Sequence, residues 1–587
     1  MQGKGMGIIM ADFNFLNSID DNKNNGKAKI DFIGTGEVGG KAHSLIIADE
    51  IVSELNSKEK YPSLSIDIPK FTVLRTGVFD DFMQMNDLYK VALSDAEDSR
   101  IAHEFQKADL PFEVLKDLRD LISKANQPLA IRSSSLLEDS KFEPFAGIYN
   151  TKMLPNNQMD IDIRCRKLYE AVKLVYASTF FKAPKDYMKA TKHSIKDEKM
   201  AVIIQEVIGR KHDDRFYPDI SGVARSYNFY PMGRSKPEEG VVDLAVGLGK
   251  TIVDGGMAWT YSPEDPAQSP PYGSVNEMLK NTQNEFWHIR MSEPEEYDPI
   301  NETEFMLLSN ITEAEKDSSI SLSASTVSDS GRITPGIGSD GPRIVNFAPV
   351  LKLELLPLND VIKDLLKISA EKFKTPVEIE FAVTTEGEGY DTSGRFGFLQ
   401  VRPMVVSNEN VEISEKEFGD KKNIITSEFV LGNGCSETIT DIVFVKPDVF
   451  NAKNTKKIAI ELEKFNSKLT DQNKKYLLIG FGRWGSSDHW LGIPVNWGQI
   501  SNVHTIVEAG LENMNVELSQ GSHFFHNMTS FGVNYFSVPA YYEHDINWDY
   551  LKKLKVISQS ENVIHAECKN PLIIKVDGKT GKGIIKP

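Results

Sequence analysis

The amino-acid sequence predicts a multidomain protein of mixed α/β or α+β architecture. Segments with the two-residue period of strands alternate with segments that have the 3.6-residue period of helices. At roughly 100–200 residues per domain, the chain length suggests about three or four domains. Of the 587 residues, 40% are hydrophobic, which is enough for large cores. The fold therefore needs neither disulfides nor a structural metal.

The composition excludes several classes of protein. A formal net charge of −17 argues against a chain whose main role is to bind nucleic acid, because such proteins normally carry a basic excess. Three widely spaced cysteines are too few for a disulfide framework or a zinc site. No stretch approaches the ~18 apolar residues of a membrane span, and the first residues show no signal-peptide cleavage site. We therefore expect a soluble, cytoplasmic protein with no nucleic-acid or membrane partner.

The amino-terminal third is expected to begin with an irregular leader over residues 1–29. A strand starts at Ile30, and a glycine cluster separates it from a helix over Ala42–Leu55. Apolar runs predict further strands at Pro128–Ser133 and Met200–Val207. Both periods therefore occur within one region of the chain.

The middle of the chain changes composition. Residues 260–345 are rich in Ser, Pro, Glu, Asp and Gly, so we expect a partly irregular excursion, an insertion or a lid. Regular structure returns with a helix near Asn359–Phe373. Strands at Val377–Thr384 and Gly397–Val401 follow, joined by a polar hairpin.

The carboxyl-terminal part is interpreted as a separate unit. Residues 407–420 form a polar linker, and residues 421–587 are expected to form a small α/β domain. That domain has a predicted helix over Lys456–Leu469 that leads into a strand over Tyr476–Ile479.

The first motif that could bind a ligand is Gly34-Thr-Gly-Glu-Val-Gly-Gly-Lys41, between a strand and a helix. Its glycines allow a tight turn and a close approach to an anion, and Lys41 adds a positive charge near a helix N-terminus. The spacing is not that of a Walker A loop. An ordinary glycine-rich turn is the alternative.

The second motif follows the strand that contains Arg132. The sequence Leu129-Ala-Ile-Arg-Ser-Ser-Ser-Leu-Leu-Glu-Asp139 precedes Gly147 and Thr151. A guanidinium, a glycine and a hydroxyl suit phosphate binding. The alternative is a solvated loop held by an Arg–Asp pair.

The third motif consists of Glu378-Ile-Glu380 on one strand and Gln400-Val-Arg402 on the next. Residues two apart on a strand share a face, so the two carboxylates point the same way. They repel unless a cation lies between them, which suggests Mg²⁺ with nucleotide phosphates. An exposed face of Glu–Arg pairs is the alternative.

Seven segments together carry a resemblance to a known family. In order, they are GGKAHSL, IRSSSLLED…FAGIYNT, VIIQEVI, SGVARS, VVDLAVGLGKTIVDGG, VEIEFAV and FLQVRPM. They resemble the nucleotide-binding region of phosphoenolpyruvate synthase, pyruvate phosphate dikinase and rifampicin phosphotransferase. The resemblance implies an α+β, ATP-grasp region over residues 30–406, with ATP and Mg²⁺ clasped between two subdomains.

The resemblance also implies roles for individual residues. Phosphates would contact Lys41 and the catalytic Arg132, beneath a loop that holds Gly147 and Thr151. Gln205 would lie at the adenine-side hinge.

On the paired strands, Glu380 and Gln400 would hold Mg²⁺ or nucleotide, and the catalytic Arg402 would reach the transferring phosphate. The sequence departs from the family pattern at one further position. The family sequence G-L-G-E is here Gly247-Leu-Gly-Lys250, which reverses a charge.

The carboxyl-terminal domain resembles a degenerate version of the family's phosphohistidine domain. Gln520-Gly-Ser-His523 is followed nine residues later by Gly532, as in the family. His523 would then carry phosphate from ATP to an acceptor. The signature lacks the family's glycine pair and has Asn534 in place of its proline, so a packed histidine is the alternative, and His526 is the second candidate.

The acceptor is not evident from the sequence. A (β/α)₈ acceptor barrel typically takes ~250 residues, which residues 421–587 cannot hold beside a shuttle domain. Pyruvate is therefore only one possible acceptor, and a separate protein could supply that site. The leading hypothesis is an ATP-dependent phosphotransferase of the phosphoenolpyruvate synthase/dikinase type. The alternatives are a non-catalytic, ATP-binding regulatory protein and an ATP-grasp ligase.

Overall fold

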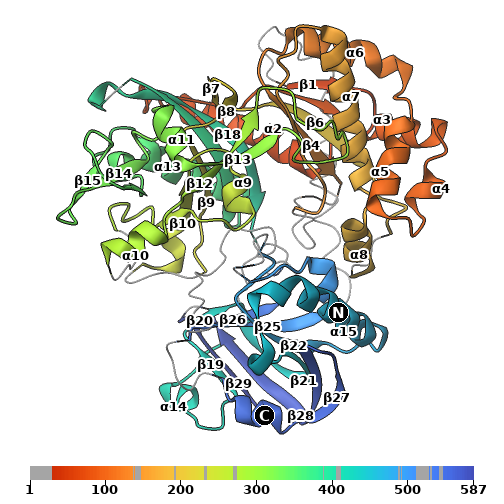
Figure 1. The fold of residues 1–587 in the computed structure, drawn as a ribbon, viewed down its shortest axis with the longest axis vertical. Helices are drawn as coiled ribbons and strands as arrows, with labels where there is room; N and C mark the ends of the chain where they lie inside the picture. Colours follow the sequence, from red (N-terminus) through yellow and green to blue (C-terminus); the bar gives the residue numbers. More distant parts are fainter. Residues whose placement is uncertain are drawn as a thin grey trace.

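The computed structural model has two neighbouring lobes and a third, carboxyl-terminal module below them (Figure 1). It describes residues 30–136, 138, 147–190, 194–229, 235–268, 274–387, 389–404, 411–486, 490, 492–510, 528, 532–540, 546–578 and 580–587. Within these residues the fold is of the α+β class, and no helix is both long and apolar enough to cross a membrane.

The first lobe is a mixed sheet covered by helices. Its strands lie in the order β1 (Ile30–Ile33), β3 (Phe71–Leu74), β6 (Met200–Glu206), β4 (Leu129–Ser135) and β5 (Lys152–Leu154). Its helices are α3 (Thr76–Met85), α4 (Tyr89–Ala92), α5 (Asp98–Lys107), α6 (Phe112–Lys124), α7 (Ile161–Ser178) and α8 (Lys182–Ala190). The Asp160 carboxylate caps α7 by accepting the Asp162 N–H at 2.7 Å.

The second lobe is built on a larger sheet. Its strand order is β11 (Trp259–Tyr261), β10 (Val241–Ala245), β9 (Ile220–Arg225), β17 (Val377–Glu386), β18 (Ser393–Pro403) and β2 (Leu64–Asp67). Helices α2 (Gly40–Asn56) and α13 (Leu358–Phe373) bury their apolar residues in the core of this sheet. The short helix α9 (Lys250–Val253) follows β10. Burial of these apolar faces is the main stabilising contribution.

Two small sheets fill much of the segment that composition marks as partly irregular. One contains β13 (Met306–Asn310), β12 (Glu285–Arg290), β8 (Arg215–Tyr217) and β7 (Arg210–His212); the other contains β15 (Ile333–Pro335), β14 (Ala324–Val327) and β16 (Arg343–Val345). Helices α10 (Val275–Lys280), α11 (Ile311–Lys316) and α12 (Ala348–Leu351) complete it. This segment contains more regular structure than its composition predicts, because its buried polar residues are paired. For example, the Ser325 hydroxyl donates to the Asn346 side chain at 2.8 Å.

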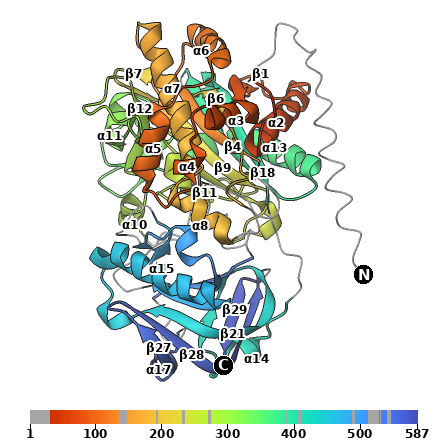
Figure 2. The same cartoon turned by 90° about the vertical axis from the view of Figure 1, so that its right-hand side faces the viewer.

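The carboxyl-terminal module is a twisted mixed sheet with helix α15 (Thr455–Asp471) on one face (Figure 2). The strand order is β19 (Ile425–Ser427), β29 (Lys582–Lys586), β28 (Val563–Asp577), β21 (Asn433–Val445), β22 (Tyr476–Phe481), β25 (Val503–Ala509), β26 (Asn534–Val538) and β20 (Phe429–Leu431), and β27 (Lys555–Gln559) also pairs with β28. Strands β21, β22, β25 and β26 run parallel to one another. The module also contains β23 (Arg483–Trp484), β24 (Gly492–Ile493) and α17 (Trp548–Lys552).

The module is docked against the first lobe. Lys182 of α8 forms an ion pair with Glu463 of α15 at 2.5 Å. The part of the expected linker that precedes β19 contains helix α14 (Glu415–Phe418), which has a complete capping box. Lys575 of β28 binds Glu417 at 2.7 Å, so this end of the linker is fixed to the module.

The sequence-based elements agree well with those observed. The expected helix over Ala42–Leu55 is confirmed as α2, and the helix near Asn359–Phe373 is confirmed as α13. The two strands of the polar hairpin are also confirmed and are longer than expected, because β17 and β18 pair from Val377 to Glu386. The predicted leader, residues 1–29, lies outside the described residues.

The close approach of β9 to β17 requires a glycine at position 222. A Cβ atom there would lie 2.2 Å from the Phe381 ring, which is itself stacked on Phe396 at 4.9 Å. We expect Gly222→Val to lower the free energy of unfolding by about 1–3 kcal/mol through overpacking. Thermal and urea unfolding measure the change. Gly338→Ala is the control, since nothing lies within 4 Å of its added Cβ; equal stability of the two variants would contradict the packing argument.

Candidate functional site

A cavity of about 310 Å³ lies where the first lobe meets the second. Strands β4, β5 and β6 contribute to one wall, and β9, β17 and β18 contribute to the other. All eight nucleotide- or metal-binding residues expected from the sequence line this cavity: Lys41, Arg132, Gly147, Thr151, Gln205, Glu380, Gln400 and Arg402. Tertiary folding therefore brings together residues that are up to 361 positions apart in the chain.

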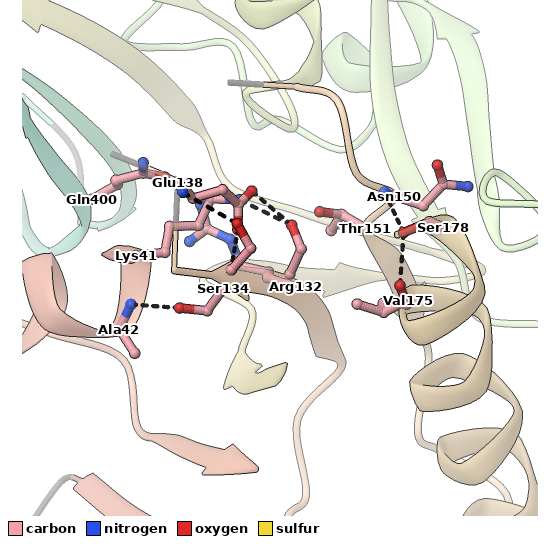
Figure 3. Close-up of polar contacts among 12 residues, drawn as sticks. Lys41, Ala42, Arg132, Ser134, Glu138, Asn150, Thr151, Val175, Ser178 and Gln400 are labelled. Atoms are coloured by element: carbon pink, nitrogen blue, oxygen red, sulfur yellow. Dashed lines mark hydrogen bonds and ion pairs between the residues drawn. The ribbon is translucent and has the colours of Figure 1, made fainter. Parts of the chain in front are cut away.

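Lys41 reaches the cavity from the first turn of α2. Its ammonium group binds Glu138 at 2.9 Å (Figure 3). It also donates to the Ser133 hydroxyl at 3.3 Å. Gly39, two residues before Lys41, has φ 78°, and a Cβ atom there would lie 1.8 Å from the Ser134 carbonyl oxygen. The glycine pair before Lys41 therefore serves close packing of this turn against β4.

Arg132 connects the two lobes. Its guanidinium donates to Gln205 at 3.1 Å within the first lobe. It also donates to the Leu399 carbonyl at 3.1 Å and to the Gln400 side chain at 2.7 Å in the second lobe. Glu380 lies 3.8 Å from it. The guanidinium thus stands at the junction of both walls of the cavity.

The two carboxylates of the third motif have different partners. Cross-strand register places Arg225 and Arg402 on either side of Glu378. Glu378 accepts hydrogen bonds from Arg225 Nε at 2.7 Å and from Arg402 Nε at 2.8 Å. Two guanidinium groups therefore supply the cations that the close carboxylates require.

Glu380 has a different environment two residues along β17. Its cross-strand neighbours are Gln400 and Val223, neither of which carries a charge. Its side chain is 17% exposed and lines the cavity, with Arg402 at 3.9 Å. Glu380 is therefore the carboxylate of the pair that faces the cavity.

Arg402 is held inside the wall of the cavity. Both its Nε and its Nη2 donate to Glu378 Oε1, and its side chain is 7% exposed. Behind Glu378, Arg225 also binds Asp243 at 3.2 Å. This buried network fixes the position of the Arg402 guanidinium before any ligand enters.

One polar group in the cavity lacks a partner among the described residues. The Gln205 side chain is 2% exposed, and its Nε2 atom has no hydrogen-bond acceptor there. A buried donor without a partner carries a desolvation penalty. An acceptor atom of a bound ligand would remove that penalty. Met153, Val207 and Leu399 give this part of the cavity an apolar lining. Such a lining suits the planar ring of a ligand.

The loop that carries Gly147 and Thr151 is anchored at two points. Gly147 has φ 64°, a conformation that favours glycine. The Asn150 N–H donates to Ser178 of α7 at 3.2 Å (Figure 3). The Thr151 N–H donates to Glu302 at 3.0 Å. Glu302 also lines the cavity, although no sequence motif marked it, because it lies in a polar segment without periodicity.

Lys250 lines the same cavity at the start of α9. Its ammonium group forms an ion pair with Asp254 at 2.7 Å and lies 5.6 Å from the centre of the Trp287 ring. The charge reversal noted in the sequence is therefore accompanied by a local partner of opposite sign.

At the paired strands β17 and β18, Glu380 and Gln400 offer a divalent cation one carboxylate and one amide oxygen. The described residues contain no group of three or more His, Cys, Asp or Glu side chains that could hold a metal ion. Mg²⁺ commonly takes only one or two carboxylates and completes its shell with water and substrate phosphates. Glu380 and Gln400 fit that requirement only with a nucleotide bound.

The predicted phosphohistidine segment follows strand β25 of the carboxyl-terminal module. His523 and His526 both lie outside the described residues. The strand that precedes them, β25, ends beside Gly482, whose N–H donates to Ala509 at 3.2 Å. The next residue, Arg483, donates to the Gly255 carbonyl at 2.7 Å, just beyond α9. The carboxyl end of the parallel strands is thus the edge that meets the rim of the cavity.

Comparison with known proteins identifies one family. A family model described as the AMP/ATP-binding domain of pyruvate phosphate dikinase matches residues 35–422, about two thirds of the chain. This domain is of the ATP-grasp type and binds ATP or AMP. The chain matches no curated protein.

Because the two carboxylates on β17 have different partners, we expect their loss to affect the stability of the protein differently. Glu378→Gln leaves two buried guanidinium groups without their shared anion, and we expect a loss of about 3–5 kcal/mol in the free energy of unfolding. Glu380→Gln is the matched control. It should cost much less, because the nearest guanidinium nitrogens are 3.8 and 3.9 Å away. Denaturant unfolding compares the two, and a larger loss for Glu380→Gln would contradict this assignment.

A buried carboxyl beside Ser135 and Tyr149 predicts a pH dependence. Burial raises the pKa of Glu198 from 4.5 to about 7, and Ser135 opposes the shift by hydrogen bonding. The folded state then binds a proton that the unfolded state releases, so stability falls by about 3 kcal/mol as the pH rises from about 4.5 to about 7. We expect Glu198→Gln to flatten this part of the stability profile. Unfolding midpoints at pH 5 and pH 8 measure it, with the exposed Glu113→Gln as the control; an unchanged slope would rule out Glu198.

Proposed function

Because the chain belongs to the pyruvate phosphate dikinase family, we propose that it is an ATP-dependent phosphotransferase. In this proposal ATP binds in the cavity between the lobes, and Glu380 and Gln400 hold Mg²⁺ together with its phosphates. A histidine of the carboxyl-terminal module, His523, receives a phosphoryl group and passes it to an acceptor. The proposal is supported chiefly by one observation: eight residues from five separate motifs line one interlobe cavity.

The charge distribution of the cavity suits phosphoryl transfer. Lys41, Arg132 and Arg402 supply cations, while Glu380 supplies an acceptor for a metal ion. Phosphoryl transfer depends mainly on positioning and on neutralising the charge that develops on the phosphate oxygens. The overall charge of −17 makes such local cations necessary for holding an anion.

The chemistry of the step itself is simple. An imidazole nitrogen attacks a phosphorus atom of ATP, and the phosphoanhydride bond to the departing nucleotide breaks. Attack at the γ position breaks the β–γ bond, leaves one phosphoryl group on the histidine and releases ADP. Attack at the β position breaks the α–β bond, leaves a pyrophosphoryl group on the histidine and releases AMP. Hydrolytic loss of the γ phosphate as orthophosphate then leaves the β phosphoryl group on the histidine. The contact between Arg483 and Gly255 supports this route, because it brings the edge of the module from which the His523 segment departs next to the cavity rim.

The proposal is tested with purified protein, Mg²⁺ and ATP labelled separately at the β and γ positions. We expect AMP and acid-labile label on the wild-type protein, with β label retained. His523→Ala should abolish the label, and Arg132→Ala should reduce its formation by at least about 100-fold, as expected for losing a charged contact to the transferring group.

The remaining outcomes separate the alternatives. Label that persists in His523→Ala but disappears in His526→Ala moves the phosphoacceptor to His526. Tight ATP binding without AMP, ADP or label overturns the phosphotransferase proposal and supports a regulatory ATP-binding protein. ADP and orthophosphate that form only with an acid and an amine support a ligase.

A further inference from the structure

The connection between β12 and β13 crosses from one lobe to the other. We refer to residues 291–305 as the interlobe strap. It leaves β12, whose small sheet contacts the second lobe through Phe286, and it packs against β5 and α7 of the first lobe (Figure 1). Asn157 donates to the Met291 carbonyl at 2.6 Å, and Lys167 of α7 binds Glu293 at 2.6 Å.

The carboxyl end of the strap is held by a buried ion pair. Lys152 of β5 binds Glu304 at 2.7 Å, and their side chains are only 2% and 3% exposed. Burial lowers the pKa of Lys152, and Glu304 opposes that shift. The adjacent Phe305 is buried, and Lys167 lies 4.9 Å from the centre of its ring. A buried pair of this kind loses much more when broken than an exposed one, so this end of the strap has a fixed position.

Glu302 lies between that anchor and the cavity. Its carboxylate accepts the backbone N–H of Thr151, the residue next to Lys152, at 3.0 Å. On the other side of the same loop, the Asn150 N–H donates to Ser178. Thr151 is thus held by a carboxylate that the strap brings to the first lobe, while its own side chain lines the cavity.

We propose that Glu302 is a positioning residue of the nucleotide site, which the strap brings to the first lobe to fix the Thr151 hydroxyl against bound phosphate. The proposal rests on the nucleotide-binding role of Thr151 put forward above. Positioning matters here because a displacement of about 1 Å in a group that contacts phosphate is enough to weaken its hydrogen bond severely. Burial raises the pKa of Glu302, while the Thr151 N–H and Lys250 oppose the shift; both effects are consistent with a carboxylate that lines the cavity beside the Thr151 N–H.

The test measures the Kd for ATP·Mg²⁺ by calorimetry in full-length variants. Glu302→Ala removes the acceptor for Thr151 and is expected to raise the Kd about tenfold. Glu302→Gln keeps an acceptor oxygen and should stay within about threefold of wild type. Glu295→Ala is the matched control on the same strap, because its side chain is 92% exposed; it should leave the Kd unchanged.

A double-variant comparison distinguishes positioning from a general structural role. If Glu302 acts through the Thr151 hydroxyl, Thr151→Val weakens ATP binding, and adding Glu302→Ala weakens it by no more than about twofold further. Full additivity of the two losses would overturn the proposal, as would wild-type affinity in Glu302→Ala. An unfolding midpoint lowered in Glu302→Ala together with failed rescue by Glu302→Gln would assign a purely structural role. Failure of the wild-type protein to bind ATP would instead reject the proposed function.

Discussion

The site depends above all on the Arg132 guanidinium, which bonds to both lobes at once. It reaches Gln205 on one side and Leu399 and Gln400 on the other. A guanidinium has five donors in a rigid plane, so it can satisfy several acceptors in different directions and still line a cavity. Exchange of Arg132 for lysine would remove this geometry while keeping the charge.

A second constraint is the separation of structural and ligand-facing charges in the second lobe. Arg225, Glu378 and Arg402 form a row across three neighbouring strands. Asp243 on the next strand also binds Arg225, so two carboxylates balance the two guanidinium groups inside the sheet. Glu380 and the polar end of Arg132 lie outside this row and line the cavity. A buried charge without its partner is costly, so the row also makes the sheet sensitive to the loss of any one member.

The lobes and the module are joined by contacts that converge near the cavity. The interlobe strap holds Thr151 from one side, and Arg483 of the module contacts Gly255 beyond α9 on another. Helix α9 itself contributes Lys250 to the lining. The cavity lining and the docked module are therefore joined through a small set of neighbouring backbone segments.

The sequence by itself determined the helices and strands that have a clear local period, and it determined which residue types line the cavity. The helix over Ala42–Leu55 and the strands of the polar hairpin could be predicted because their period is local, and the residues of the cavity could be predicted from motifs in a recognisable order. Only the tertiary structure decided that Glu380 faces the cavity while Glu378 does not, since the two are equivalent by strand period and differ only in the residues opposite them. It alone revealed Glu302, because the contact with Thr151 joins positions 151 residues apart and leaves no local pattern.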